Sequence, residues 1–382
     1  MTEKQIKFNE PWLSGKELEY VQQSLASGQL SGDQTFSKQC QGFMENRFGA
    51  QKVLLTTSCT SALEMAALLC DIKEGDEVIM PSFTFVSTAN AFLLRGAKIK
   101  FVDIREDTFN IDENLIEKAI TTKTKAIVPV HYASIGCEMN AINTIAKNHG
   151  LYVIEDAAQA VDTKYNGNYM GTLGDAGAYS FHETKNFVAG ECGALVINQP
   201  DWIERAEIIR EKGTNRSQFI RGHVDKYTWV DVGSSYVPSD MLAAVLLAQF
   251  ESMDEINHKR QNVADMYRSR LQPLEDIGLF KMPHVPANCT TNNHMFSLLC
   301  HSPVLREKLL KDLNAAKIQA VFHYIPLHNS PLAKQKGFFE QPLKVTEHVS
   351  ASLIRLPMFP GLTQQNIAHI CNVIITSCES VR

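Results

Sequence analysis

The chain has 382 residues, of which 44% are hydrophobic and 21% are charged. This length has room for a large domain and a smaller companion, with enough core to fold without a disulfide or a metal. Its 37 basic and 42 acidic side chains give a formal net charge of −5, so no basic excess is present for binding nucleic acid.

The first nine residues are polar, and no run of about 18 apolar residues occurs in the chain, so we expect neither secretion nor membrane spanning. The nine cysteines are scattered, with no C-x-x-C pair and no zinc spacing. This pattern is typical of reduced, buried thiols. We therefore expect a cytoplasmic protein without a metal site.

Short apolar runs recur in the first half of the chain, with starts 21, 27 and 26 residues apart. They predict strands at 77–80, 98–102, 125–130 and 151–154, separated by helical segments at 89–94, 113–120 and 139–147. Alternation of this kind indicates parallel βαβ units in a covered sheet. Ligands of such sheets bind at the carboxyl ends of the strands.

The flanking segments extend this pattern on both sides. We predict a helix at 60–70, strands at 178–181 and 194–197, a helix at 202–212 and a long helical stretch at 239–266. The tail contains a predicted strand at 295–299 and predicted helices at 305–316 and 366–377. The sequence thus predicts a large α/β domain over residues 1–250, with an N-terminal arm and helix, and a smaller α+β domain over residues 251–382.

Two charged side chains follow predicted strands. Asp156, in the pair Glu155-Asp156, ends the strand at 151–154, where it either faces the ligand or caps the next turn. Lys185 follows the strand at 178–181 and is either a surface charge or a desolvated amine of lowered pKa.

Two further segments suit a planar anionic ligand. The hydroxyl-rich run from Thr56 to Ser61 opens a predicted helix, and it is either an ordinary cap or a phosphate cup. It is neither a Walker A loop nor a Rossmann fingerprint. Phe83 or Phe85, after the strand at 77–80, either packs in the core or covers a flat ring.

The four features together match one cofactor. Pyridoxal phosphate needs a lysine for its Schiff base, a carboxylate at the pyridine nitrogen, an anion cradle for its phosphate and an aromatic ring to stack on. Each feature is weak alone, and the ordered set is specific.

Several runs resemble a known family. They are G-D-E-V-I-M-P-S-F-T-F-V-S-T-A-N-A (75–91), P-V-H-Y-A (129–133), V-I-E-D-A-A-Q (153–159), Y-S-F-H-E-T-K-N (179–186) and L-P-M-F-P-G-L-T (356–363). The chain resembles the DegT/DnrJ/StrS sugar nucleotide aminotransferases, which are pyridoxal-phosphate enzymes of fold type I. The resemblance covers nearly the whole chain. It implies the aspartate aminotransferase-like architecture, with a large, mostly parallel sheet domain and a smaller α+β domain.

The resemblance also implies residue roles. Lys185 forms the Schiff base and then shuttles the proton, and Asp156 pairs with the pyridinium nitrogen. Lysine at 185 favours transamination, because a dehydratase branch of the family has histidine there. The other cofactor contacts implied are the ring of Phe85, the side chain of Gln159 and the phosphate ligands Cys59, Thr60 and Ser180.

One segment departs from the family pattern. Most members carry G-x-N-x-R, whose asparagine reaches the cofactor phosphate of the neighbouring subunit, whereas this chain has Gly233-Ser-Ser-Tyr-Val237. Ser235 keeps a hydrogen-bond donor there, and Val237 does not replace the arginine. The resemblance implies a homodimer, or a higher oligomer, with active sites at the subunit interface.

The runs at 208–219, 224–229 and 321–328 carry a closer likeness, to members that aminate C4 of a dTDP-6-deoxyhexose. The expected reaction moves an amino group from L-glutamate to dTDP-4-keto-6-deoxy-D-glucose. The alternatives are amination at C3 or on the other face of C4, and a non-catalytic regulatory protein that binds the cofactor.

Substrate contacts are expected from polar residues near the strand ends and from a basic stretch. The basic candidates for the diphosphate are Arg210, Lys212, Arg216, Arg221 and Lys226, with a solvated surface as the alternative. The other candidates are His131, Tyr132, His182, Tyr227, His323 and Tyr324, for several of which ordinary core hydrogen bonding is the alternative.

Overall fold

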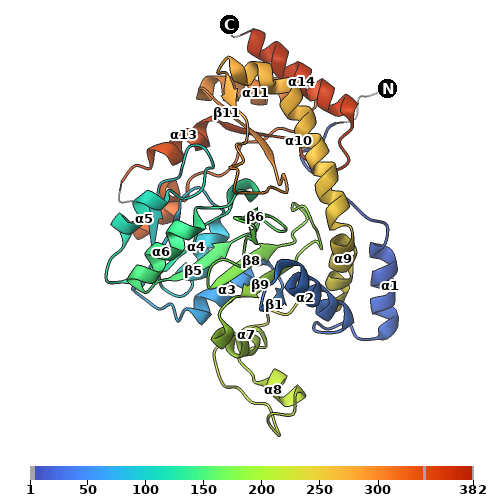
Figure 1. The fold of residues 1–382 in the computed structure, drawn as a ribbon, viewed down its shortest axis with the longest axis vertical. Helices are drawn as coiled ribbons and strands as arrows, with labels where there is room; N and C mark the ends of the chain where they lie inside the picture. The colour runs from blue at the N-terminus through green and yellow to red at the C-terminus, as the bar shows by residue number, and fades with distance from the viewer. Residues whose placement is uncertain (1–4, 339–340, 381–382) are drawn as a thin grey trace.

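The computed structural model describes residues 5–338 and 341–380. A seven-stranded mixed sheet lies at its centre (Figure 1). In spatial order its strands are β1 (Lys52–Thr56), β9 (Gly193–Ile197), β8 (Ala176–Ser180), β5 (Tyr152–Asp156), β4 (Thr124–Ile127), β2 (Glu77–Pro81) and β3 (Lys98–Val102).

The five strands from β8 to β3 pair in parallel, and β9 runs antiparallel to both of its neighbours. This confirms the predicted α/β class with a mostly parallel sheet. The strand order places β5 in the middle, so the residues at its carboxyl end lie at the centre of the ligand-binding edge.

Helices cover both faces of the sheet. Side chains of β1 alternate between two buried clusters: Val53 and Leu55 enter one, and Leu54 enters the other. The first face carries α2 (Thr35–Phe48), α6 (Met139–His149) and α9 (Asp240–Glu251), and the second carries α3 (Cys59–Leu69), α4 (Val86–Leu93) and α7 (Ile203–Arg210). Helix α1 (Glu17–Ser27) lies beside α9, and α5 (Glu113–Ala119) lies beside α6 (Figure 1).

A second, antiparallel sheet forms in the last third of the chain, in the order β10 (Phe280–Lys281), β11 (Phe296–Cys300) and β12 (Leu353–Leu356). A third buried cluster packs it against α10 (Met253–Asp276), α11 (Pro303–Ala315) and α14 (Gln364–Glu379) (Figure 1). The remaining elements are β6 (Lys164–Tyr165), β7 (Asn168–Tyr169), α8 (Arg216–Ile220), α12 (Pro331–Lys336) and α13 (Lys344–Ser352).

The predicted elements are present with shifted ends: the strand expected at 125–130 ends at Ile127, and the last turns of α10 extend beyond 266 to Asp276. The expected helical stretch at 239–266 is two helices, α9 and α10, because Ser252 leaves the helical conformation at φ −104° and ψ 11°. Apart from Leu327 in the second cluster, the buried residues of the first two clusters end at Ile256, and those of the third begin at Val263. The domain division near residue 250 stays a prediction, which this change of core supports.

An arm that includes α8 projects from the large sheet beyond α7 (Figure 1). It exposes the apolar side chains of Phe219, Ile220, Tyr227, Trp229, Val230 and Val232. Within residues 5–338 and 341–380, no helix combines the length and the hydropathy needed to cross a bilayer.

Candidate active site

A cavity of about 1020 Å³ opens between the carboxyl ends of the large sheet's strands and the second sheet. Ten of the residues predicted from the sequence line it. They are Cys59, Thr60, Phe85, Asp156, Gln159, Ser180, His182, Lys185, His323 and Tyr324. Residues from the first, middle and last thirds of the chain therefore meet at the edge where ligands of such sheets bind.

Asp156 is the last residue of β5 and is only 6% exposed. Its Oδ2 accepts a hydrogen bond from Thr88 Oγ1 at 2.7 Å, and its Oδ1 accepts one from the amide of Ala158 at 3.2 Å. Thr84 Oγ1 lies 2.7 Å from Thr88 Oγ1. Because Thr88 already donates to the carboxylate, Thr84 donates to Thr88, and the chain of hydroxyls supports a negative charge on Asp156.

Lys185 lies in the loop between β8 and β9, in a turn closed by its amide and the carbonyl of His182 at 2.9 Å. Its Nζ has no hydrogen-bond acceptor in the described part of the chain. Burial lowers the pKa of Lys185, and the charge of Arg355 lowers it further, against the opposing influence of Cys59 and Asp156. A lysine in this state offers a free amine for attack on a carbonyl.

The start of α3 supplies backbone donors to the cavity. Ser58 caps the helix by accepting from the amide of Ser61 at 3.0 Å, and Thr60 Oγ1 donates to Ser87 Oγ at 2.8 Å. A Cβ on Gly193 of β9 would lie 2.4 Å from the nitrogen of Cys59. The close approach of β9 therefore requires glycine and fixes the position of this helix start. Burial raises the pKa of the Cys59 thiol, which stays neutral.

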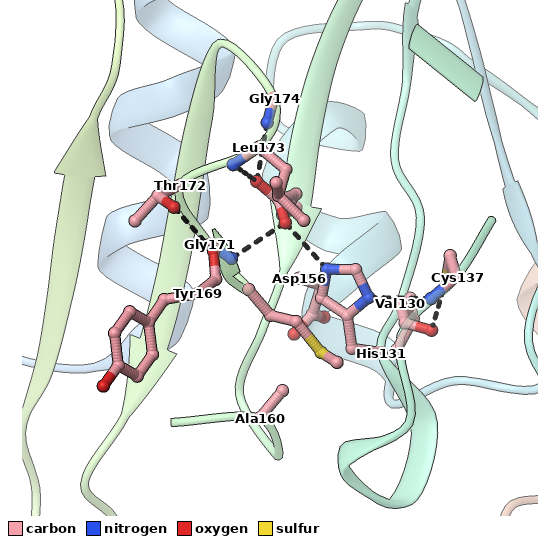
Figure 2. A network of polar contacts seen from close by, with 12 residues as sticks. Val130, His131, Cys137, Asp156, Ala160, Tyr169, Gly171, Thr172, Leu173 and Gly174 are labelled. Carbon is pink, nitrogen blue, oxygen red and sulfur yellow. Dashed lines mark hydrogen bonds and ion pairs between the residues drawn. The ribbon is translucent and has the colours of Figure 1, made fainter. Parts of the chain in front are cut away.

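Glu155 and His131 form a buried structural network beside the cavity, so the expectation that His131 contacts substrate is wrong. Figure 2 shows the His131 ring and the backbone nitrogens of Gly171, Leu173 and Gly174 around one carboxylate. This is Glu155, which His131 Nε2 reaches at 2.8 Å and the three amides reach at 2.7–2.8 Å. His131 is fully buried, and its Nδ1 accepts from the amide of Cys137 at 3.1 Å.

Tyr132 also lies outside the lining of the cavity, with 1% of its surface exposed. Its hydroxyl is 2.5 Å from Nδ1 of His323, which does line the cavity. Tyr132 thus supports the wall and does not form it. The prediction that it contacts substrate is corrected for this chain.

The basic stretch 210–226 does not face this chain's cavity. Arg210 is 4% exposed and binds Asp33, Gln41 and the carbonyl of Leu55, so the expectation that it holds a diphosphate is wrong. Arg221 forms two contacts with Glu207, at 2.7 and 3.1 Å, on the surface. Lys212 and Arg216 pair with Glu211, and Lys226 is exposed.

Two other predicted residues lie away from the cavity of their own chain. Tyr227 is 52% exposed on the projecting arm, beside the ring of Phe219. The backbone of Ser235 pairs with that of Glu211 in an isolated antiparallel β-bridge. The role expected for Ser235 belongs to a neighbouring subunit, so it stays a prediction.

Phe8, Asn9, His294 and Arg355 are among the lining residues that the sequence did not predict. Arg355 directly precedes the run L-P-M-F-P-G-L-T, which was the available signal for it. Phe8 and Asn9 carried no signal, because they reach the cavity through pairing of the N-terminal segment with distant residues at 317–319 and 358.

Residues 12–375 match the model of the DegT/DnrJ/EryC1/StrS aminotransferase family. The chain belongs to this family. It is 32% identical to GDP-perosamine synthase from Escherichia coli O157:H7, over 97% of this chain and 98% of that protein.

Two solved structures extend this similarity. Helicobacter pylori PseC, an aminotransferase involved in the biosynthesis of pseudoaminic acid, superimposes with a TM-score of 0.90 and 27% identity, over 99% of this chain and all of that one. NtdA from Bacillus subtilis, solved with bound cofactor PMP, has a TM-score of 0.86 and 26% identity, over 96% of this chain and 83% of its own.

The protein is therefore a sugar nucleotide aminotransferase that depends on pyridoxal phosphate. The donor set in the cavity fits this cofactor, because it combines an amine of lowered pKa, a buried carboxylate and free backbone amides at a helix start. When bound, the cofactor supplies an electron sink for the carbon that gains or loses the amino group.

Proposed function

We propose that the protein transfers the amino group of L-glutamate to the 4-keto carbon of dTDP-4-keto-6-deoxy-D-glucose. The products are dTDP-4-amino-4,6-dideoxy-D-galactose and 2-oxoglutarate. The observation that carries the chemistry is the meeting of Lys185, Asp156 and the start of α3 in one cavity. The choice of sugar rests on the closer sequence likeness of 208–229 and 321–328 to the transaminases of enterobacterial common antigen synthesis.

Each predicted cofactor-binding residue of the cavity has a part in this proposal. Lys185 Nζ would attach to the cofactor and would afterwards move the proton between the amino-donor carbon and the cofactor's C4′. Asp156 holds the proton on the pyridine nitrogen, with Thr88 and the amide of Ala158 stabilising its charge. Phe85 and Gln159 flank the ring, and the phosphate is held by Cys59, Thr60 and Ser180.

The first test is spectroscopic. We expect the purified protein to show the absorbance band of a lysine-bound cofactor, and Lys185→Ala to lose both the band and turnover. Lys164→Ala is the control, since Lys164 stacks on Tyr169 away from the cavity. An unchanged spectrum in Lys185→Ala would contradict the role of Lys185.

The second test concerns the substrate. We expect 2-oxoglutarate to be released from glutamate in the presence of the 4-keto sugar nucleotide, and NMR of the product to show an axial amine at C4. Reaction only with a 3-keto sugar, or the opposite configuration at C4, would move the assignment within the same enzyme class. Cofactor binding without any turnover would support a regulatory protein instead.

We further propose a homodimer in which the projecting arm of one subunit, including Ser235, reaches the active site of the other. The support is the exposed apolar surface on the arm and, at the cavity mouth, that of Phe85, Phe322 and Ile325. Such a surface is typical of protein interfaces. The product then serves cell-surface polysaccharide assembly, with the enzyme in the cytoplasm.

The dimer is tested by light scattering and by mixing subunits. We expect Trp229→Ser with Ile325→Ser to shift the mass from dimer to monomer. If the sites are shared, mixing Ser235→Ala subunits with Lys185→Ala subunits gives hybrid dimers that contain one subunit of each kind. One of the two active sites in such a dimer then has both Lys185 and Ser235, and we expect part of the activity to return. A monomeric wild type with full activity would contradict the shared site.

A further inference from the structure

His323 and Tyr324 form a stacked pair of rings on the wall of the cavity opposite the large sheet. Their centroids are 3.6 Å apart and their planes differ by 25°. Two residues earlier in the chain, Val321 pairs with Arg355 of β12, so the pair and the guanidinium lie on neighbouring backbones. All three side chains line the cavity.

The hydrogen-bond network sets the tautomer of His323. Tyr132 is buried, and burial raises the pKa of its phenol, which therefore keeps its proton. The only acceptor within reach of that hydroxyl in the described part of the chain is Nδ1 of His323, at 2.5 Å. Because Nδ1 accepts, the hydrogen of the neutral ring is on Nε2, which is left to serve the cavity as a donor.

Tyr324 keeps its hydrogen in a similar way. Gln159 Oε1 accepts from the amide of Ala133 at 2.7 Å, which fixes the orientation of the Gln159 side chain. Its Nε2 must then donate to the hydroxyl of Tyr324, at 3.0 Å. The oxygen of Tyr324 is an acceptor in this bond, so its own hydrogen remains available to the cavity.

Arg355 adds a positive charge beside this pair. Its Nε and Nη2 donate to the carbonyl of Phe322 at 3.3 and 3.1 Å, and its guanidinium lies 4.8 Å from the ring centroid of Phe8. No carboxylate in the described part of the chain pairs with it. Desolvation lowers the pKa of Arg355, and its charge contributes to the lowered pKa of His323, which stays neutral.

We propose that Arg355, His323 and Tyr324 form the binding site for the carboxylate of the amino donor. The inference rests on the proposed function and names the part of the cavity that selects the donor. A carboxylate only accepts hydrogen bonds and carries a single negative charge, which matches one guanidinium and two directed donors.

The other ligand groups match this site less well. A diphosphate carries two charges, and the charged residues that line the described cavity are Asp156, Lys185, Glu191 and Arg355, with Lys185 assigned to the cofactor. A sugar hydroxyl needs an acceptor as well as a donor. Tyr132 and Gln159 act as positioning residues in this proposal, because they direct the two hydrogens without touching the ligand.

The experiment separates the two half-reactions on the holoenzyme by following the cofactor's absorbance in single turnovers. One half uses glutamate alone, and the other uses the keto sugar with the aminated enzyme. Arg355→Gln, Arg355→Lys and Tyr132→Phe are compared with Arg268→Gln. Arg268 is a matched control, since it also donates to a carbonyl (Pro283, 2.7 Å), lies over a ring (Phe296, 5.8 Å) and is away from this cavity.

We expect the glutamate concentration for half-maximal rate to rise about 10- to 100-fold in Arg355→Gln, as for loss of a charge-assisted hydrogen bond. Arg355→Lys should fall between this variant and the wild type. The sugar half-reaction should stay within about twofold, and calorimetric binding of glutarate, an unreactive dicarboxylate, should weaken in parallel with glutamate. Arg268→Gln should change none of these.

The tautomer has its own readout. In ¹⁵N spectra of histidine-labelled protein, the signals of His323 are assigned as those that disappear in His323→Gln. In the wild type they should show an Nδ1 without hydrogen, and in Tyr132→Phe they should show a mixture of the two tautomers. A merely structural role for Tyr132 would leave that ratio unchanged. If Arg355→Gln slowed the sugar half-reaction and left the binding of glutamate and glutarate unaltered, the proposal would be overturned. A wild type that does not react with glutamate would instead contradict the proposed function itself.

Discussion

The two walls of the cavity are built in different ways. The sheet wall, formed by the ends of β5 and β8 and the starts of α3 and α4, holds its functional groups close to a buried sheet and supports Asp156 from two sides. The outer wall, formed by residues 8–9, 321–325 and 355, leaves Phe322 54% and Ile325 67% exposed. In our proposals the reaction chemistry resides on the sheet wall, and recognition of the amino donor resides on the outer wall.

Within the sheet wall, the neighbouring residues Glu155 and Asp156 are expected to have different roles: Glu155 stabilises the fold, and Asp156 takes part in the reaction. Glu155→Ala would leave His131 and three buried amides without their acceptor, and we expect it to lower the free energy of unfolding by about 3–5 kcal/mol. Denaturant unfolding of the holoenzyme measures this loss. Glu117→Ala, which removes an exposed partner of His149 at 3.3 Å, is the control and should cost under about 0.5 kcal/mol.

Asp156→Asn tests the chemical half of this division. We expect kcat to fall about 10²- to 10³-fold, because a neutral amide does not stabilise positive charge on the pyridine nitrogen. The free energy of unfolding should decrease far less in Asp156→Asn than in Glu155→Ala. The division between the two neighbours would fail if Asp156→Asn unfolded as readily as Glu155→Ala, or if it kept full activity.

The contact between β9 and α3 offers a test of the phosphate cup. In Gly193→Ala the new Cβ would overlap the backbone of Ser58 and Cys59, so we expect a cost of about 1–3 kcal/mol and weaker retention of cofactor on dialysis. Gly42→Ala is the matched control, since a Cβ there meets open space within α2, and it should stabilise the chain by about 0.5–1 kcal/mol. Equal cofactor retention in the two variants would contradict the placement of the phosphate.

The smallest effect concerns the pH dependence of the cofactor-free protein. Because the pKa of Lys185 is lowered on folding, the unfolded chain binds more protons between the lowered and the ordinary pKa. Stability from this group therefore rises as pH increases through that window and is lost at lower pH. We compare the unfolding midpoints of the wild type and Lys185→Met from pH 7 to 10. The amount by which the midpoint of Lys185→Met exceeds that of the wild type should decrease as pH rises. A difference in midpoint that stays constant with pH would argue against a lowered pKa of Lys185.

Local patterns predicted most of the sheet wall, whereas on the outer wall they indicated only His323 and Tyr324 and missed Phe8, Asn9 and Arg355. Asp156 and Lys185 follow strands whose apolar residues are contiguous in the sequence, so the rule on strand ends was enough to place them. The same reasoning misplaced His131. Its partner Glu155 points away from the cavity, toward the turn at residues 171–174, and nothing in the sequence shows this direction. Helix α2 and strands β1 and β12 were not predicted. Arg210 was taken for a free cation, because the sequence does not show that the fold brings Asp33 to it.

The N-terminal segment ties the completion of the site to the order of synthesis. Ile6 pairs with Ile318, and the carbonyl of Phe8 accepts from the amide of Met358, so the first cavity residues find their partners more than 300 positions later. On the ribosome, the large sheet has all its strands before these partners exist. Contacts over such separations form slowly, and a nascent chain cannot pair its Phe8 until Gln319 and Met358 have been synthesised.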